Sequence, residues 1–193
     1  MLGLRTEITD VKVRLTNTNE NFDYKYTELF PTINIGFERT EDQSFTVGYS
    51  RRLRRPRFWY LNPFESRSSQ NVIYKGNPGL TPTFTNSFDL GYLQKIGKLT
   101  LNSSIYFQHS INSILRVSRD EIRFIDGVNQ VITIREPINL ASEDRFGFEL
   151  TTNYNPSKKV RLSGSFNVFQ QESKGLYAYN KFIIDEISGD IIA

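Results

Sequence analysis

The chain has 193 residues, of which 38% are hydrophobic, 13% are aromatic and 23% are charged, with a formal net charge of +3. Disordered chains are rarely this aromatic, and no run approaches the ~18 apolar residues of a transmembrane helix. The small positive excess gives little support for a nucleic-acid partner. Because the sequence has no cysteine and a single histidine, His109, and no nucleophile or phosphate-binding motif, we expect no metal site, no cofactor and no enzyme.

The ends of the sequence resemble the interior of a fold. Residues 1–8 alternate as though the chain begins inside a strand, and residues 182–193 end without a polar tail. We therefore expect residues 1–193 to be part of a longer protein.

Period-2 alternation of apolar and polar side chains dominates the sequence, and no stretch keeps helical periodicity for three turns. Such alternation predicts strands with one apolar and one polar face. The apolar positions of the expected strands are, in chain order, Leu2, Leu4 and Ile8; Ile33, Ile35 and Phe37; Phe45, Val47 and Tyr49; Phe84, Phe88, Leu90 and Tyr92; Leu99, Leu101, Ile105 and Phe107; Phe146, Phe148, Leu150 and Tyr154; and Val160, Leu162, Phe166 and Val168. We predict an all-β fold, an antiparallel meander of about seven strands.

The connections between these strands alternate in length. Short turns are expected at residues 39–43, 95–98 and 155–159, and long connections at residues 10–31, 55–82, 118–142 and from 172 onward. Structureless connections longer than about 12–15 residues are uncommon in compact soluble domains, whereas outer-membrane barrels combine short periplasmic turns with long extracellular loops. The layout favours an open segment of a large transmembrane β-barrel.

Aromatic side chains flank the expected short turns, as in the girdles of membrane barrels: Phe37, Phe45, Tyr92 and Tyr154. The polar positions are mostly small and uncharged, which suits a wall around a wet lumen. We expect ten apolar side chains on the convex, lipid-facing side of an unclosed sheet: Phe45, Val47, Phe88, Leu90, Leu101, Ile105, Phe148, Leu150, Leu162 and Phe166. A soluble β-sandwich, which would bury them between two sheets, is an alternative.

Residues 49–64, YSRRLRRPRFWYLNPF, resemble a signature of TonB-dependent receptors, in particular of the outer-membrane β-barrel family common in Bacteroidetes. The resemblance continues through the stretch GNPGLTP at residues 76–82 into residues 88–92. It implies a C-terminal barrel fragment in the outer membrane of a Gram-negative bacterium, from a receptor that imports a scarce solute of the siderophore, glycan or peptide class.

The resemblance also implies partners for the complete receptor: outer-membrane lipid, a plug domain in the lumen and the TonB complex of the inner membrane. Residues 1–193 contain no candidate plug, and about seven strands cannot close a barrel of the 22-strand size. The two outer strands would therefore have unpaired edges, which lipid does not tolerate. A non-transporting surface barrel or adhesin that binds partners through its loops is the alternative function.

The densest charge is five arginines within residues 51–57, followed by Phe58, Trp59 and Tyr60. A guanidinium group suits carboxylate or phosphate ligands, and aromatic rings add stacking. We expect a ligand or lipopolysaccharide contact at the outer rim, with Arg54, Arg57, Trp59 and Tyr60 as ligand-binding residues. The alternative is that the arginines pair with loop carboxylates or with the plug.

Three local features complete the prediction. By alternation Arg51 shares the lipid face of Tyr49, where a midplane arginine costs about 2–4 kcal/mol. Either a bulge changes its facing, or the chain has left the lipid there. Residues 76–79 predict a fixed turn, and Asp126-Gly127 predicts a hairpin that projects beyond the membrane.

Overall fold

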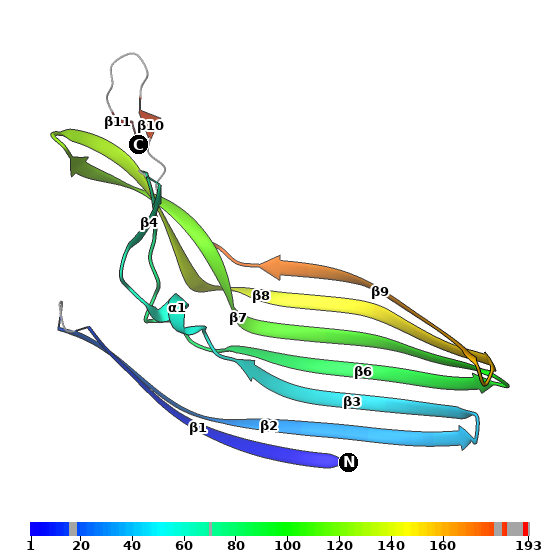
Figure 1. Cartoon of the computed structure of the whole chain (residues 1–193). Coiled ribbons are helices and arrows are strands. Elements are labelled where there is room, and N and C mark those ends of the chain that lie inside the picture. The colour runs from blue at the N-terminus through cyan, green and yellow to red at the C-terminus, as the bar shows by residue number, and fades with distance from the viewer. Residues whose placement is uncertain (16–18, 70, 180–182, 185–190, 193) are drawn as a thin grey trace.

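The computed structural model describes residues 1–15, 19–69, 71–179, 183–184 and 191–192. Its main feature is one curved antiparallel sheet of long strands (Figure 1). The long strands, in their order across the sheet, are β1 (Leu2–Leu15), β2 (Glu20–Thr40), β3 (Gln43–Arg54), β6 (Thr83–Ile96), β7 (Leu99–Ile125), β8 (Val128–Ser157) and β9 (Val160–Lys174). Successive long strands pair as neighbours, which confirms the predicted all-β meander.

The sheet is not closed. β1 pairs only with β2 and β9 only with β8 in the part of the chain that the structure describes. A separate two-stranded pair, β10 (Ile183–Ile184) and β11 (Ile191–Ile192), follows near the C-terminus. Most of the segment from residue 180 onward, part of the last predicted connection, lies outside the described residues. Of the described helices, none is long and apolar enough to cross a membrane.

The short turns lie where they were predicted, at one end of the sheet (Figure 1). β2 and β3 are joined across residues 41–42, β6 and β7 across residues 97–98, and β8 and β9 across residues 158–159. Gly97 has a φ of +57°, which a glycine adopts without steric cost. Near these turns the rings of Phe45 and Tyr92 lie 4.8 Å apart, so two of the predicted girdle aromatics are in contact.

Two of the predicted long connections consist mostly of strand. β1 and β2 continue their pairing out to Leu15 and Glu20, and β7 and β8 continue to Ile125 and Val128. The residues between the last two, Asp126 and Gly127, both have positive φ, as the predicted hairpin requires. Pairing continues beyond the membrane-spanning part because backbone donors and acceptors still need partners there.

The connection at residues 55–82 is a folded loop at the end of the sheet opposite to the short turns (Figure 1). It contains α1 (Phe58–Leu61), β4 (Ser66–Ser69) and β5 (Val72–Tyr74), and β5 pairs in parallel with β8. At the predicted fixed turn, the Gly76 amide donates to the Asn62 carbonyl at 2.8 Å. The Asn77 amide donates to the Tyr60 carbonyl at 2.6 Å.

The apolar positions of neighbouring strands are directly opposite one another, so they share one face of the sheet. Val47 pairs with Leu90, and Leu90 with Ile105. Among the described residues no second sheet covers this face, and side chains such as Phe88 (51%) and Leu162 (57%) are exposed. All ten predicted lipid-facing residues are exposed or half-buried. The sandwich alternative, which buries them, is therefore wrong.

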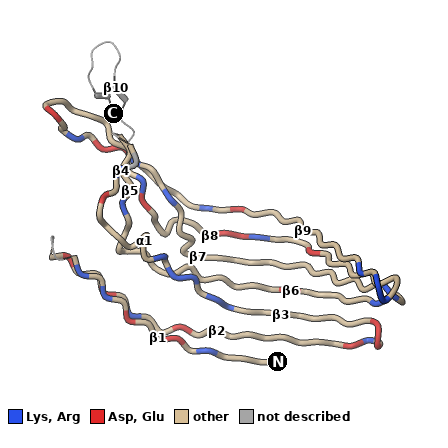
Figure 2. The backbone as a smooth tube through the Cα atoms, viewed as in Figure 1, with Lys and Arg blue, Asp and Glu red and all other residues tan. Residues whose placement is uncertain are grey.

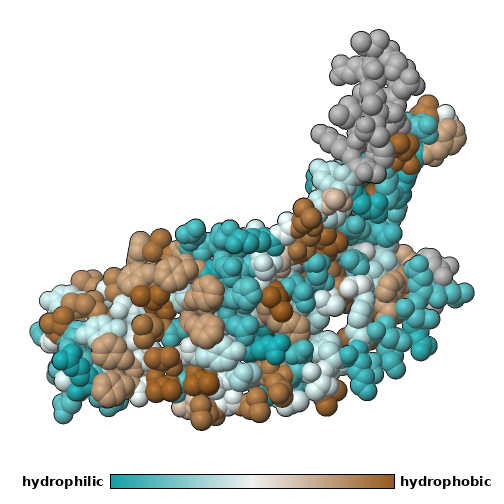
Figure 3. Space-filling view, turned by 180° about the vertical axis from the view of Figure 1, so that it is seen from behind, coloured by the Kyte–Doolittle hydropathy of each residue, from teal (hydrophilic) through white to brown (hydrophobic). Residues whose placement is uncertain are grey.

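Charged side chains and exposed apolar side chains occupy different parts of the strands. Most charged residues lie toward the two ends of the strands and in the loops (Figure 2). Hydrophobic side chains lie at the surface over the long strands (Figure 3). The most buried apolar side chains belong instead to the loop end of the sheet: Phe30, Ile73, Leu80, Ile132 and Ile134. The compact core therefore supports the loops, and the spanning strands form a single layer.

Arg51 keeps the same face as Tyr49, because the β3–β6 register runs through Arg51 and Asn86 without a shift. The proposed bulge is therefore absent. The pairing of β2 with β3 ends at Ser50, and Arg51 follows at once. Its guanidinium lies 2.9 Å from the Glu28 carboxylate and 5.2 Å from the centre of the Phe84 ring. A carboxylate and an aromatic ring compensate its charge at the rim.

Polar residues continue across the sheet from Arg51. Cross-strand pairing aligns Asn86 with His109, His109 with Asp144, and Asp144 with Glu172. The His109 Nδ1 atom lies 2.6 Å from the Asp144 carboxylate. This polar row interrupts the apolar face at the level of Arg51 and favours the second expectation for Arg51, that the chain has left the lipid there.

Candidate functional site

The folded loop at residues 55–82 and the projecting β7–β8 hairpin enclose a cavity of about 390 Å³, which we call the hairpin cavity. α1 contributes Trp59 and Tyr60, β5 contributes its last residue, Tyr74, and Lys75 follows directly after β5. The hairpin itself contributes two arginines, Arg116 from β7 and Arg135 from β8, together with Pro137. Aromatic rings and cationic groups thus face one space at the outer end of the sheet.

Three of the four predicted ligand-binding residues lie together. The Arg57 guanidinium carbon lies 5.2 Å from the centre of the Trp59 ring, a cation–π geometry. Trp59 in turn meets Tyr60 edge-on, with ring centres 6.3 Å apart. Trp59 is 57% exposed, so most of its ring surface is accessible. Arg57, Trp59 and Tyr60 therefore form one aromatic and cationic surface beside the hairpin cavity.

Arg54, the fourth predicted residue, lies elsewhere. It lines a second pocket, of about 330 Å³, on the polar face of the sheet, with Glu143, Arg145 and Gln171. The Arg145 Nε donates to the Gln171 side chain at 3.2 Å, and Gln171 in turn contacts Glu143. The structure does not bring Arg54 to Trp59 and Tyr60.

The alternative expected the arginines to pair with loop carboxylates or with the plug; two of them pair with carboxylates that lie in the strands β1 and β2. Arg51 pairs with Glu28 of β2, and Arg55 pairs with Glu7 of β1. The first contact joins β2 to β3, and the second joins β1 to the start of the folded loop. The hydroxyl of Tyr24 adds a hydrogen bond of 2.7 Å to the Pro78 carbonyl. These contacts stabilise the outer end of the sheet, where the folded loop begins.

Sequence reasoning missed the cationic residues that line the hairpin cavity, Lys75, Arg116 and Arg135. A partial signal was present, because a two-residue turn at 126–127 fixes the register of the hairpin. That register places Arg116 opposite Pro137 and Arg135 opposite Ser118, so both arginines belong to one face. No comparable signal brings β5 to this hairpin, where Tyr74 pairs with Arg135.

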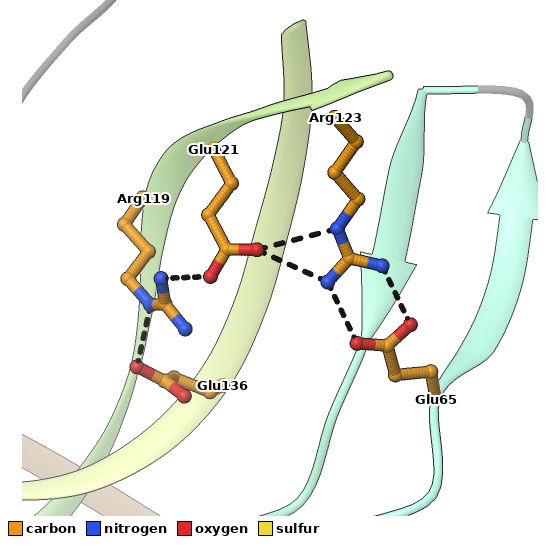
Figure 4. A network of polar contacts seen from close by, with 5 residues as sticks. All are labelled: Glu65, Arg119, Glu121, Arg123 and Glu136. Atoms are coloured by element: carbon orange, nitrogen blue, oxygen red, sulfur yellow. Dashed lines mark hydrogen bonds and ion pairs between the residues drawn. The ribbon is translucent and has the colours of Figure 1, made fainter. Parts of the chain in front are cut away.

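A network of five charged residues lies beside the cavity (Figure 4). Arg123 donates two hydrogen bonds of 2.8 Å to Glu65 of the loop and two, of 3.0 and 3.3 Å, to Glu121. Arg119 contacts Glu121 and donates to Glu136 at 3.2 Å. The hydrogen bonds from Arg123 hold the pKa of the Glu65 carboxyl below its usual value. This network ties the folded loop to the hairpin.

Within the described ranges, no group of three or more His, Cys, Asp or Glu side chains is arranged to hold a metal ion. Arg54, Arg57 and the cations of the hairpin cavity are instead suited to anions. The chemistry available at the outer end is therefore binding through charge and stacking.

Comparison with models of protein families assigns the chain to a family. The model of the outer membrane protein beta-barrel family matches residues 1–189, and the chain belongs to this family. It is accordingly a protein of the outer membrane. None of the curated proteins compared with it matches. The narrower resemblance to Bacteroidetes receptors stays a prediction.

Solved barrels show the same fold at low sequence identity. The copper transporter OprC is 16% identical with a TM-score of 0.63, covering 90% of this chain and 27% of OprC. The siderophore receptor PirA from Pseudomonas aeruginosa is 16% identical with a TM-score of 0.61, covering 86% of this chain and 31% of PirA.

A mutant ferric enterobactin receptor from Pseudomonas aeruginosa, solved with enterobactin, is 17% identical with a TM-score of 0.60. The match covers 88% of this chain and 24% of that receptor. The chain thus spans less than a third of the barrel proteins that it matches, and its open sheet corresponds to a segment of their barrels.

Proposed function

We propose that the chain is a barrel segment of a TonB-dependent transporter that imports a scarce solute across the outer membrane. The observation that carries the proposal is the single-layered sheet with one exposed apolar face and one polar face. Such a layer is stable only with lipid on one side and a filled or wet lumen on the other. The likeness in fold to siderophore receptors and a copper transporter supports transport as the task.

The proposal assigns a partner to each remaining surface. Lipid covers the apolar face, and further strands pair with the free edges of β1 and β9. A plug domain fills the lumen against the polar face, where Tyr106, Asn167 and Glu149 already form a hydrogen-bonded chain. The TonB complex supplies energy through the plug.

The solute enters, in this proposal, past the aromatic and cationic surface of Arg57, Trp59 and Tyr60. Arg54 lies on the polar face and would meet the solute deeper in the lumen. The solute class remains that of the sequence analysis: a siderophore, a glycan or a peptide. Loop binding without import, as in an adhesin, is the outcome that would replace transport.

The experiment compares solutes removed from the growth medium by cells that carry the complete receptor, by cells without it, and by cells whose proton-motive force is collapsed. Mass spectrometry identifies the solutes. We expect one class to disappear only with the receptor and an energised membrane. An assembled barrel that removes nothing in an energy-dependent way would contradict transport.

A variant series tests the entrance. Replacing Arg57, Trp59 and Tyr60 together with alanine should reduce uptake while the barrel still assembles at the surface. Replacing Arg39, in the chain just before a short turn at the opposite end, removes one charge and should leave uptake unchanged. Normal uptake by the triple variant would reject the entrance role, and loss of the assembled barrel would make these residues structural.

A further inference from the structure

We propose that the hairpin cavity binds a compact solute that carries a planar ring and at least two negative charges. The inference rests on the proposed function, because it names the class of solute that the outer end of the barrel receives. It concerns residues outside the predicted arginine cluster, on the β7–β8 hairpin and at the end of β5.

The first argument is the contrast between the two faces of the projecting hairpin. On one face, Arg119 and Arg123 are neutralised by the glutamates of the network in Figure 4. On the other face, Arg116 and Arg135 have no carboxylate within ion-pair distance among the described residues. Arg119 and Arg123 thus stabilise the structure through ion pairs, whereas Arg116 and Arg135 remain available to bind an anion.

The second argument is the composition of the cavity wall. Lys75, Arg116 and Arg135 line it, and none of the lining residues is acidic. Three cationic groups around one small space repel one another unless an anion joins them. Guanidinium groups bind carboxylate or phosphate through paired donors, so a solute with two or more negative charges satisfies this wall.

The third argument is the position of the rings. Arg116 lies over the Tyr60 ring, with its guanidinium carbon 5.4 Å from the ring centre. Arg135 lies 5.7 Å from the centre of the Tyr74 ring and donates to the Tyr74 hydroxyl at 3.0 Å. Trp59 presents a further, largely exposed ring. A planar ring can stack against these side chains while its anionic groups reach the guanidinium groups.

The fourth argument is that the wall is fixed in place before any solute arrives. The Lys75 amide donates to the Arg135 carbonyl at 3.0 Å, and the Asn77 side chain donates to the Pro137 carbonyl at 3.3 Å. The Asn77 amide also donates to the Tyr60 carbonyl. These bonds join α1, β5 and β8 around the cavity, and a preformed site loses little entropy on binding. A volume of about 390 Å³ suits a small molecule.

The test uses the complete barrel, purified in detergent, and three defined probes. Trimesate has a benzene ring with three carboxylates, tricarballylate has three carboxylates without a ring, and benzenetrimethanol has the ring without charge. Isothermal titration measures each affinity. We expect trimesate to bind at least tenfold more tightly than either of the other two. Equal affinities for trimesate and tricarballylate, or no binding of trimesate, would overturn the proposed class.

Variants assign the binding to this cavity. Arg116→Gln and Arg135→Gln should each weaken trimesate about tenfold, as expected for one lost charge-assisted hydrogen bond. Tyr60→Leu should weaken trimesate and leave tricarballylate unchanged. Arg67→Gln removes the same charge from β4, outside the cavity, and should change neither affinity. Unchanged trimesate binding in both arginine variants would overturn the assignment.

Two controls separate this proposal from the transport proposal. Each variant must show the altered gel mobility on heating that marks a folded barrel, and the probe series on the unaltered barrel needs no variant at all. Energy-dependent uptake is measured in cells and does not depend on the probes. Uptake without probe binding would overturn the solute class alone, whereas probe binding without uptake would overturn transport alone.

Discussion

Gly76 is the position at which one added carbon should open the hairpin cavity. A Cβ built there would lie 2.7 Å from the Tyr60 carbonyl oxygen and closer still to that of Asn62. Real Cβ contacts essentially never fall below 3.0 Å, so Gly76→Ala requires the backbone to move. Neither obstacle is a flexible side chain that could turn away.

The cost follows from the bonds at the same place. The two obstructing oxygens accept the hydrogen bonds from Gly76 and Asn77, at 2.8 and 2.6 Å. Each such bond contributes about 0.5–1.5 kcal/mol, and overpacking adds about 1–3 kcal/mol. A local loss of about 2–6 kcal/mol would detach the segment of α1 and Asn62 from the end of β5. The spanning strands should be unaffected.

Limited trypsin digestion of the complete barrel in detergent measures this opening, because Arg57 lies just before α1. Cleavage at Arg57 should accelerate at least tenfold in Gly76→Ala, since about 1.4 kcal/mol corresponds to a factor of ten. Gly36→Ala in β2 is the matched control, because a Cβ there meets no atom within 4 Å. Equal cleavage of the Gly76→Ala variant and the unaltered barrel would refute the reasoning.

Two further predictions follow from the charge network and from the faces of the sheet. Because Arg123 holds the pKa of Glu65 below its usual 4.5, their pairing stabilises the loop above pH 4.5 and is lost as the pH falls through the lowered pKa. Trypsin works poorly in acid, so pepsin digestion should show the loop loosening there. Glu65→Gln should remove the part of this pH dependence that Glu65 contributes; an unchanged profile would contradict it. On the lipid face, Val47→Arg should destabilise the folded barrel by about 2–4 kcal/mol in denaturant titration, whereas Thr46→Arg on the polar face should cost little. Equal losses would reject the assigned faces.

The sequence by itself determined the strands, their faces and the turns. Alternation is a local property, because successive side chains of a pleated strand point to opposite faces and an apolar or polar residue indicates which face its position occupies. Two-residue turns such as Asp126-Gly127 are local too, because positive φ at both positions allows few other shapes. The alternation of short and long connections along the chain predicted that the loop at residues 55–82 lies at the end of the sheet opposite to the short turns.

Only the tertiary structure decided which cations are paired. In the sequence Arg51, Arg54 and Arg57 form one cluster, yet the structure separates them. Arg51 pairs with Glu28, Arg54 lines the pocket on the polar face, and Arg57 lies beside Trp59. Arg135 gains Tyr74 as a neighbour through the parallel pairing of β5 with β8. A three-residue strand has no pattern that selects its partner, so the packing of the whole loop makes that choice. Pairing between segments as far apart in the sequence as β5 and β8 depends on the summed contacts of the whole fold. The hairpin cavity is formed by this pairing, so no single segment of the sequence could indicate it.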